Sequence, residues 1–448
     1  MQTILIKNVF VVNEGHIKVL DVLIRNGRIE KISSFIALEK QAMMTIDGLG
    51  LFLIPGLIDA QVHFREPGLI TKGTLNSESK AAVAGGITSF MDMPNTVPST
   101  TTMELMEQKF SLASQQSFAN YSFFFGLTKH NLEEALKLDN ETVCGLSDDG
   151  LYFNDEEGIL ANYPDYLEKL FSRSDALIAL HCEDDQIIKK NEAAYRTWKS
   201  SIPPEAHAKI RSALACLEAT KRVVNIAKKH NTRFHVLHVS TLAEANLLNQ
   251  EEFLRNKRIT GEACIHHLWF SENDYEKYGH EIKWNPSIKK ESDRRGLIMA
   301  LKSGKLDTIA TDHAPHLLNE KFGDYFQVKS GAPIVQECLL LLLELYHKGE
   351  ISLEDIVQKS SHNVAEIYRI KERGYIREGY FADLVLIDLK KGMRGKRKSF
   401  YQCGWSLFDD YPFKSHVVTT FVNGIPVYHE GNFFGAIKGQ RLQFEKER

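Results

Sequence analysis

The chain has 448 residues, of which 43% are hydrophobic and 25% charged, which is usual for a globular protein with one large domain and a smaller one. Its formal net charge of -3 gives no reason to expect nucleic acid or an anionic membrane surface as a partner. Its six scattered cysteines, without a CxxC spacing, favour a reduced, cytoplasmic setting, and its most apolar run is too short to span a membrane.

Both ends of the chain predict short β-strands. Residues 4–12, 19–34 and 44–50 alternate apolar and polar side chains, and Asn26-Gly27 is a hairpin signal. A similar strand-like pattern returns at 382–389 and 416–431, and Asn423-Gly424 divides the second of these segments. We therefore expect a small β-sandwich domain built from both termini, residues 1–50 plus 378–448.

The middle of the chain, residues 51–377, alternates buried apolar runs with amphipathic helical stretches such as 74–85 and 213–230. The expected strands are 51–61, 87–94, 120–127, 143–148, 176–183, 234–240, 258–263 and 307–313. This number of βα units predicts an α/β fold, a (β/α)8 TIM-like barrel, and a doubly wound sheet is the alternative.

Polar residues that suit metal binding recur where these strands end. They are Asp59, Gln61, His63 and Arg65, then Asn95, Asp148, Asp149, His181, His238, His266, His267, Asp312, His313 and His316. The carboxyl ends of barrel strands meet at one face. Neutral imidazole and carboxylate are ligands that Zn²⁺ prefers, and a catalytic zinc keeps one position open for water. The pattern therefore predicts a metal site at this face.

Single residues in the pattern also have simpler structural interpretations. Asp59 is suited to cap a turn, and Asp148-Asp149-Gly150 is a common turn tripeptide. His235 lies two residues before His238 and is an alternative inward-facing side chain. The pair at 266–267 could be one surface residue and one packing residue. The recurrence at five strand ends nevertheless favours a joint metal site.

The motifs also match a known family. "PGLIDAQVHFREPG", "MDMPNT", "SDDG", "HCEDD", "HVST", "KWNPSI" and "ATDHAPH" occur in the order seen in dihydroorotases of the amidohydrolase superfamily. The sequence resembles that family over nearly its whole length. It is most similar to the class I bacterial type, in which an aspartate replaces the carboxylated lysine that bridges two zincs in relatives. The resemblance implies one or two Zn²⁺ per chain and a homodimer.

The resemblance also implies a role for individual residues. His63 and Asp312 would hold the more buried metal, His181 and His238 the second, and Asp149, favoured narrowly over Asp148, would bridge them. The implied substrate-binding residues are Arg65, Asn95 and His316 for the carboxylate and ring, and Asn285 with the backbone of Ala332 and Pro333 for the ring. Residues 317–331 are in the place of a mobile stretch.

The implied activity is the reversible interconversion of N-carbamoyl-L-aspartate and L-dihydroorotate in pyrimidine (UMP) biosynthesis. A metal makes hydroxide available near neutral pH by lowering the pKa of water, and Asp312 would act as general base and acid for the departing ring nitrogen. The planar fork of Arg65 suits the small-molecule substrate's carboxylate. Allantoinases and dihydropyrimidinases, whose substrates have neutral rings, are the alternative.

Gln61 departs from the family, which has a histidine two residues before His63. A glutamine amide oxygen is a weaker ligand for Zn²⁺ than imidazole. The buried metal would be held with Gln61 or a water filling the gap, bind more weakly, or be absent in a non-catalytic homologue. Because Arg65, Asp312 and His316 are all present, we expect an active enzyme in which Gln61 is a doubtful ligand.

Overall fold

The computed structural model describes residues 3–37, 44–151, 159–197, 201–251, 253–392, 398–434 and 439–446. An eight-stranded parallel sheet runs through the middle of the chain in sequence order. Its strands are β6 (Leu57–Val62), β7 (Ile87–Asp92), β8 (Asn120–Gly126), β9 (Gly145–Ser147), β10 (Ile178–Leu180), β11 (Phe234–Val236), β12 (Ile259–Cys264) and β13 (Thr308–Ala310).

Backbone hydrogen bonds join the last strand to the first. His63 N donates to the His313 carbonyl at 2.7 Å, and Asp312 N donates to the Gln61 carbonyl at 2.9 Å. A doubly wound sheet has two open edges, so that alternative is wrong and the predicted (β/α)8 barrel is confirmed.

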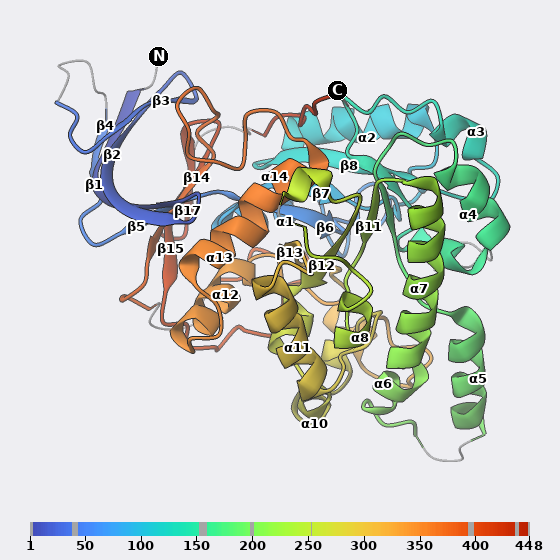
Figure 1. Ribbon diagram of the computed structural model, residues 1–448. Coiled ribbons are helices and arrows are strands. Elements are labelled where there is room, and N and C mark those ends of the chain that lie inside the picture. The colour runs from blue at the N-terminus through green and yellow to red at the C-terminus, as the bar shows by residue number, and fades with distance from the viewer. Residues whose placement is uncertain are drawn as a thin grey trace.

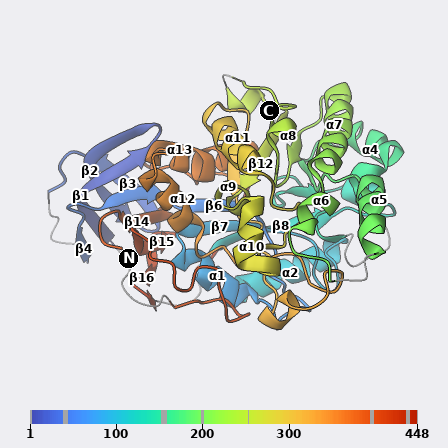
Figure 2. The same ribbon diagram turned by 90° about the horizontal axis from the view of Figure 1, so that it is seen from below.

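Helices surround the barrel (Figures 1 and 2). They are α1 (Leu75–Ala84), α2 (Met103–Gln116), α3 (Leu132–Ala135), α4 (Pro164–Phe171), α5 (Asp185–Arg196), α6 (Ala206–Ile210), α7 (Ala213–His230), α8 (Leu242–Ala245), α9 (Ile265–Trp269), α10 (Tyr275–Tyr278), α11 (Glu291–Lys302), α12 (Cys338–His347), α13 (Leu353–Val357) and α14 (Asn363–Tyr368). The expected helices at 74–85 and 213–230 are α1 and α7. Among the described residues, no helix combines the length and apolar character that crossing a bilayer requires.

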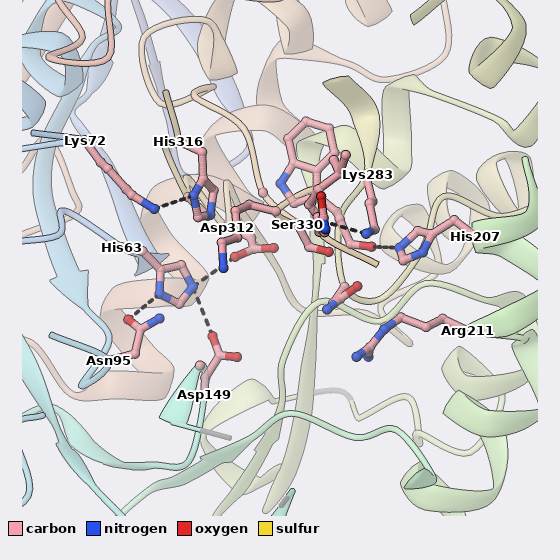
Figure 3. A pocket seen from close by; sticks show the side chains of 18 of the residues that line it. His63, Lys72, Asn95, Asp149, His207, Arg211, Lys283, Asp312, His316 and Ser330 are labelled. Carbon is pink, nitrogen blue, oxygen red and sulfur yellow. Dashed lines mark hydrogen bonds and ion pairs between the residues drawn. The ribbon is translucent and has the colours of Figure 1, made fainter. Parts of the chain in front are cut away.

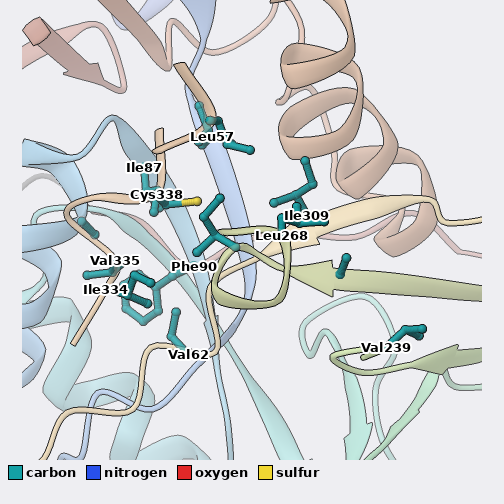
Figure 4. Packing of buried hydrophobic residues seen from close by; sticks show 14 of the residues in the cluster. Leu57, Val62, Ile87, Phe90, Val239, Leu268, Ile309, Ile334, Val335 and Cys338 are labelled. Carbon is teal, nitrogen blue, oxygen red and sulfur yellow. The ribbon is translucent and has the colours of Figure 1, made fainter. Parts of the chain in front are cut away.

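An apolar cluster fixes the strands that carry the first and last site residues. Leu57 on β6 and Phe90 on β7 belong to one buried cluster with Ile309 on β13 (Figure 4). Ile334 and Val335, which precede α12, belong to the same cluster. Burial of such side chains stabilises the fold by about 1.5–3 kcal/mol each. The cluster therefore anchors the strand ends from which His63 and Asp312 follow.

The C-terminal segment 439–446 crosses the end of the barrel where the strands begin. Tyr121 N donates to the Gln440 carbonyl at 3.0 Å, and Leu442 N donates to the Tyr121 carbonyl at 2.9 Å. Leu442 and Phe444 are buried in one cluster with side chains inside the barrel, among them Phe124. This segment was expected in the terminal domain, but its contacts are with the barrel.

The remaining strands form a mixed nine-stranded sheet from both ends of the chain. They are β1 (Thr3–Asn13), β2 (His16–Arg25), β3 (Arg28–Ser33), β4 (Met44–Asp47), β5 (Phe52–Pro55), β14 (Leu384–Asp388), β15 (His416–Val422), β16 (Ile425–His429) and β17 (Asn432–Phe433). The blue N-terminal and orange-red C-terminal strands lie together on the side of the molecule opposite α4, α5 and α7 (Figures 1 and 2). Asn26, Gly27, Asn423 and Gly424 all have positive φ, as hairpin turns of this sequence require.

The expected strand 51–61 is two strands. β5 pairs with β1 and β14 in the terminal sheet, whereas β6 pairs with β7 in the barrel. Gly56 separates them and lies so close to Thr88 that a Cβ there would come within 2.1 Å of the Thr88 Oγ1. The terminal sheet therefore extends to Pro55, and the barrel begins at Leu57.

Candidate active site

The His63 imidazole lies between two carboxylates at the C-terminal face of the barrel. Its Nδ1 donates to the Asn95 Oδ1 at 2.7 Å, which leaves Nε2 3.1 Å from the Asp312 Oδ1 and 3.3 Å from the Asp149 Oδ2 (Figure 3). Burial lowers the pKa of His63, but Asp149 and Asp312 outweigh burial and raise that pKa to about 10. His63, Asp149 and Asp312 are called here the first group. Its two carboxylates favour a positive charge on the His63 imidazole.

The second group consists of His181, His238 and Asp149. The His181 Nε2 lies 2.8 Å from the Glu183 Oε2, to which it donates, so its Nδ1 lone pair faces the His238 Nε2 at 2.9 Å. The Asp149 Oδ1 lies 3.6 Å from the His181 Nδ1 and 3.8 Å from the His238 Nε2. Two ring nitrogens this close require a shared proton or a cation between them.

Both groups fit a divalent metal ion. In each, the ligand atoms lie within 4.8 Å of one another, and every residue is buried. Imidazole nitrogen and carboxylate oxygen are the donors found at zinc sites. Asp149 belongs to both groups, so its two oxygens face different histidines.

Asp148 and His235, the two sequence alternatives, have other partners. The Asp148 carboxylate accepts the backbone N–H groups of Leu160 at 2.9 Å and His181 at 3.1 Å. The His235 Nδ1 is bonded to the Thr260 hydroxyl at 2.7 Å. Neither residue belongs to a metal group.

Asp59, His266, His267 and His313 also have structural contacts. The Asp59 carboxylate accepts the Gln61 N–H at 3.3 Å and the Thr311 hydroxyl at 2.6 Å, and the second contact links β6 to the end of β13. His266 and His267 are both buried, so neither is a surface residue. The His313 Nε2 lies 2.8 Å from the Glu78 carboxylate.

Gln61 is fully buried beneath the first group. Its Nε2 donates to the Asp149 Oδ2 at 2.9 Å, and the Cys264 thiol donates to its Oε1 at 3.3 Å. The amide thus directs its nitrogen, which is not a metal ligand, towards Asp149. In this conformation Gln61 supports a ligand rather than acting as one.

A cavity of about 410 Å³ adjoins the first group. Among the predicted substrate-binding residues, it is lined by Arg65, Asn95, Asn285 and His316. The Arg65 guanidinium lies 3.1 Å from the His316 Nε2, and the Lys72 Nζ lies 3.0 Å from the His316 Nδ1. Burial lowers the pKa of Arg65 to about 10, so the guanidinium stays charged at neutral pH. Arg65 therefore adds a positive charge to this wall of the cavity, whereas Lys72 is ion-paired with Glu320 at 2.7 Å.

The opposite wall includes the segment after β13. His207, Arg211 and Lys283 lie across the cavity from His63 (Figure 3). The Lys283 Nζ donates to the backbone carbonyls of Tyr325 at 2.6 Å and Val328 at 2.7 Å. Residues 325–331 thereby line the cavity. The expected mobility of 317–331 stays a prediction.

Ala332 and Pro333 are not among the described residues that line the cavity. The Ala332 carbonyl instead accepts the Ala314 N–H at 3.2 Å. Gly331 and Ser330, one and two residues earlier, line the cavity in their place.

Sequence reasoning missed several polar residues at this site, among them Lys72, Glu183, Arg211 and Lys283. Glu183 had a signal, because it follows His181 by two residues in "HCEDD". Lys283 also had a signal, because it opens the motif "KWNPSI" two residues before Asn285. Arg211 comes from a segment without a local pattern, and only the folded chain brings it to the cavity.

Comparisons with known proteins agree with this geometry. Residues 52–427 match the model of the amidohydrolase family. A dihydroorotase of Methanosphaera stadtmanae is 30% identical, covering 95% of this chain and 96% of that protein. A dihydroorotase of Wolbachia sp. subsp. Drosophila simulans is 33% identical, covering 86% of each.

Solved structures show the same fold. The L-hydantoinase (dihydropyrimidinase) from Arthrobacter aurescens superposes with a TM-score of 0.90 at 24% identity, covering 99% of this chain and 100% of that one. The dihydropyrimidinase from Brevibacillus agri NCHU1002 gives a TM-score of 0.86 at 24% identity, with all of both chains covered. The family match and the full-length similarity to dihydroorotases show that this chain belongs to the amidohydrolase family.

Proposed function

We propose that this chain is a zinc-dependent dihydroorotase of pyrimidine biosynthesis, which interconverts L-dihydroorotate and N-carbamoyl-L-aspartate. The observation that carries the proposal is the Arg65 guanidinium, buried in the cavity wall beside His316 and near the first group. Dihydroorotate carries a carboxylate on its ring, whereas hydantoin and dihydrouracil do not. A buried arginine suits that carboxylate and is costly to leave facing a neutral ring.

The metal groups supply the remaining chemistry. Divalent ions held by the first group (His63, Asp149 and Asp312) and the second group (His181, His238 and Asp149) would act as Lewis acids and lower the pKa of water. Asp312 lines the cavity, and its Oδ1 lies 3.1 Å from the His63 Nε2. In ring opening, the oxygen of water bonds to the ring carbonyl carbon, the carbon–nitrogen bond breaks, and Asp312 carries the proton to the departing nitrogen.

Neighbouring residues orient these groups. Asn95 accepts the His63 Nδ1–H, which fixes the ring with Nε2 towards the carboxylates. Arg65 also donates to the Pro315 carbonyl at 3.1 Å, so its side chain is held before substrate arrives. Because His63 and Arg65 are already held in place, the binding energy of the substrate is not needed to order these side chains and can orient the substrate ring.

A substrate panel tests the proposal. Initial rates should be measured with L-dihydroorotate, dihydrouracil, hydantoin and allantoin on one metal-loaded preparation. We expect turnover of dihydroorotate and a kcat/KM at least about 30-fold lower for the neutral rings, since one missing ion pair in a buried site costs about 2–5 kcal/mol. Turnover of a neutral ring alone would assign the chain to another cyclic amidohydrolase. No turnover of any ring would favour a non-catalytic homologue.

Replacing Asp312 by asparagine tests the proton-transfer role. The change keeps the side chain's size but removes the base, and general base catalysis contributes about 10²–10⁴-fold. We expect kcat to fall by at least about 10²-fold, while the circular dichroism spectrum is unchanged. Near-normal turnover would remove Asp312 from this role.

A further inference from the structure

The His181 imidazole is held by a carboxylate that belongs to neither metal group. Its Nε2 lies 2.8 Å from the Glu183 Oε2, and both side chains are fully buried. Because a carboxylate only accepts hydrogen bonds, the His181 proton lies on Nε2 and the Nδ1 lone pair faces Asp149 and His238. The Glu183 contact thus selects the tautomer that the second group needs.

An arginine from the cavity wall holds Glu183 in turn. The Arg211 Nη1 donates to the same Glu183 Oε2, and Arg211 lines the cavity opposite His63 (Figure 3). The Arg211 carbonyl is itself fixed, because it accepts from the Ser287 hydroxyl at 2.8 Å and the Lys289 ammonium at 3.0 Å. Arg211, Glu183 and His181 therefore form a continuous chain from the cavity to the second group.

We propose that Glu183 and Arg211 are positioning residues for the second group. Glu183 fixes the His181 ring and increases its basicity, and Arg211 fixes and charge-balances Glu183. Without Arg211 the buried carboxylate would lose its largest favourable charge interaction and keep the His181 imidazole with a smaller contribution from Lys289, which is unfavourable. Carboxylate partners of histidine ligands typically contribute about 10- to 100-fold to metal affinity. The proposal rests on the proposed metal site but is independent of the substrate.

The barrel provides a matched control for Glu183. The Glu78 carboxylate lies 2.8 Å from the His313 Nε2, and both side chains are fully buried. The two carboxylate–imidazole contacts thus have the same length and burial. His313 belongs to neither metal group, so Glu78→Gln reports the structural cost of losing such a contact without changing a ligand's partner.

The test is a competition titration of Zn²⁺ against a chromophoric chelator. The proteins are wild type, Glu183→Gln, Arg211→Met, Arg211→Lys and Glu78→Gln, and melting temperatures of the metal-free forms are measured alongside. We expect Glu183→Gln to weaken one zinc equivalent by about 10- to 100-fold, Arg211→Met to weaken the same equivalent, and Arg211→Lys to restore part of it. Glu78→Gln should lower the melting temperature while both zinc affinities stay at the wild-type values.

Each other outcome has a distinct meaning. Wild-type zinc affinities in Glu183→Gln, or equal losses in Glu183→Gln and Glu78→Gln, would overturn the positioning role. If Glu183→Gln does not fold, Arg211→Met decides the question alone, and unchanged zinc binding there contradicts the proposal. A wild-type protein that binds no zinc would instead contradict the proposed metal-dependent function.

Discussion

Asp149 is the residue on which both metal groups depend, since its two oxygens face His63 on one side and His181 with His238 on the other. The preceding Asp148 accepts only backbone N–H groups in the contacts of the described residues. The two adjacent carboxylates therefore have separate tasks, which local sequence could not assign because both belong to one turn tripeptide.

Replacing each aspartate by asparagine separates these tasks. Asp149→Asn should remove most metal binding at both positions, because an amide is a poor substitute for a bridging carboxylate. Asp148→Asn should lower stability by about 1–3 kcal/mol, the cost of a disturbed buried hydrogen bond, and leave the metal content unchanged. Metal analysis and urea unfolding measure both quantities. If Asp148→Asn lost metal and Asp149→Asn did not, Asp148 would be the metal ligand and Asp149 the structural residue.

Gln61→His tests the departure from the family pattern. The Gln61 nitrogen lies 2.9 Å from the Asp149 Oδ2, so an imidazole at this position would bring a ligand nitrogen to the first group. We expect the metal content to rise towards two per chain and the affinity of the weaker equivalent to increase about tenfold or more. Gln61→Leu, which has no ligand atom, is the control. Equal metal content in all three proteins would place residue 61 outside the metal shell.

Residue types at strand ends were sufficient to expect His63, His181, His238 and Asp312 at one site, because the barrel brings those ends to one face, whereas only the family resemblance favoured Asp149 over Asp148. The same reasoning could not locate Arg211 or Lys283, since neither follows a strand. The proposed ligand roles themselves stay predictions until metal binding is measured.

At the scale of elements, two buried lysines hold the segment after β13. Lys283 donates to the Tyr325 and Val328 carbonyls, and the Lys321 Nζ donates to the Lys329 and Gly331 carbonyls, both at 2.8 Å. Burial, reinforced by Arg211, lowers the pKa of Lys283 to about 7. Protonation of Lys283 therefore lowers the free energy of unfolding.

Lys283→Met gives a pH-dependent test of that charge. A lysine whose folded pKa lies below its unfolded pKa of about 10.4 binds fewer protons when folded, so its contribution to stability rises with pH. The contribution is fully present above the unfolded pKa and is lost as the pH falls through about 7. We expect the difference in free energy of unfolding between wild type and Lys283→Met to increase from pH 7 to pH 10. A difference that is independent of pH would contradict the lowered pKa.

Helices and strands were predictable where one spacing of apolar residues continues over the whole element. α7 begins and ends at the expected residues, 213–230, because its apolar face repeats over 18 residues. The junction between β5 and β6 falls at Pro55-Gly56, a dipeptide typical of turns, and it was missed because both strands are apolar and only Gly56 separates them. Only the pairing of β5 with β1 and β14 separates them.

At the scale of the molecule, the C-terminal segment joins the last residues of the chain to the beginning of the barrel strands. Phe444 is buried there with Leu442, whereas Phe434 is 46% exposed. Phe444→Ala should destabilise the fold by roughly 3–5 kcal/mol, the usual cost of removing a buried phenylalanine, without changing metal affinity. Phe434→Ala is the control and should cost about 0.5 kcal/mol or less. Equal effects would mean that the segment adds little to barrel stability.

The fold of the whole chain followed from the count of βα units and the strands at both ends. The homodimer and the cytoplasmic setting stay predictions, and the first is checked by sedimentation. The zinc content and the substrate also stay predictions, because neither a metal's identity nor a ring's charge follows from the fold.

A zinc titration of chelator-treated protein, with L-dihydroorotate hydrolysis followed at each addition, tests directly whether metal bound by the two groups drives the reaction. We expect no hydrolysis without metal and a rate that rises with bound zinc until both groups are filled. Hydrolysis that persists in fully metal-free protein, or zinc binding at both groups without any hydrolysis, would contradict this expectation.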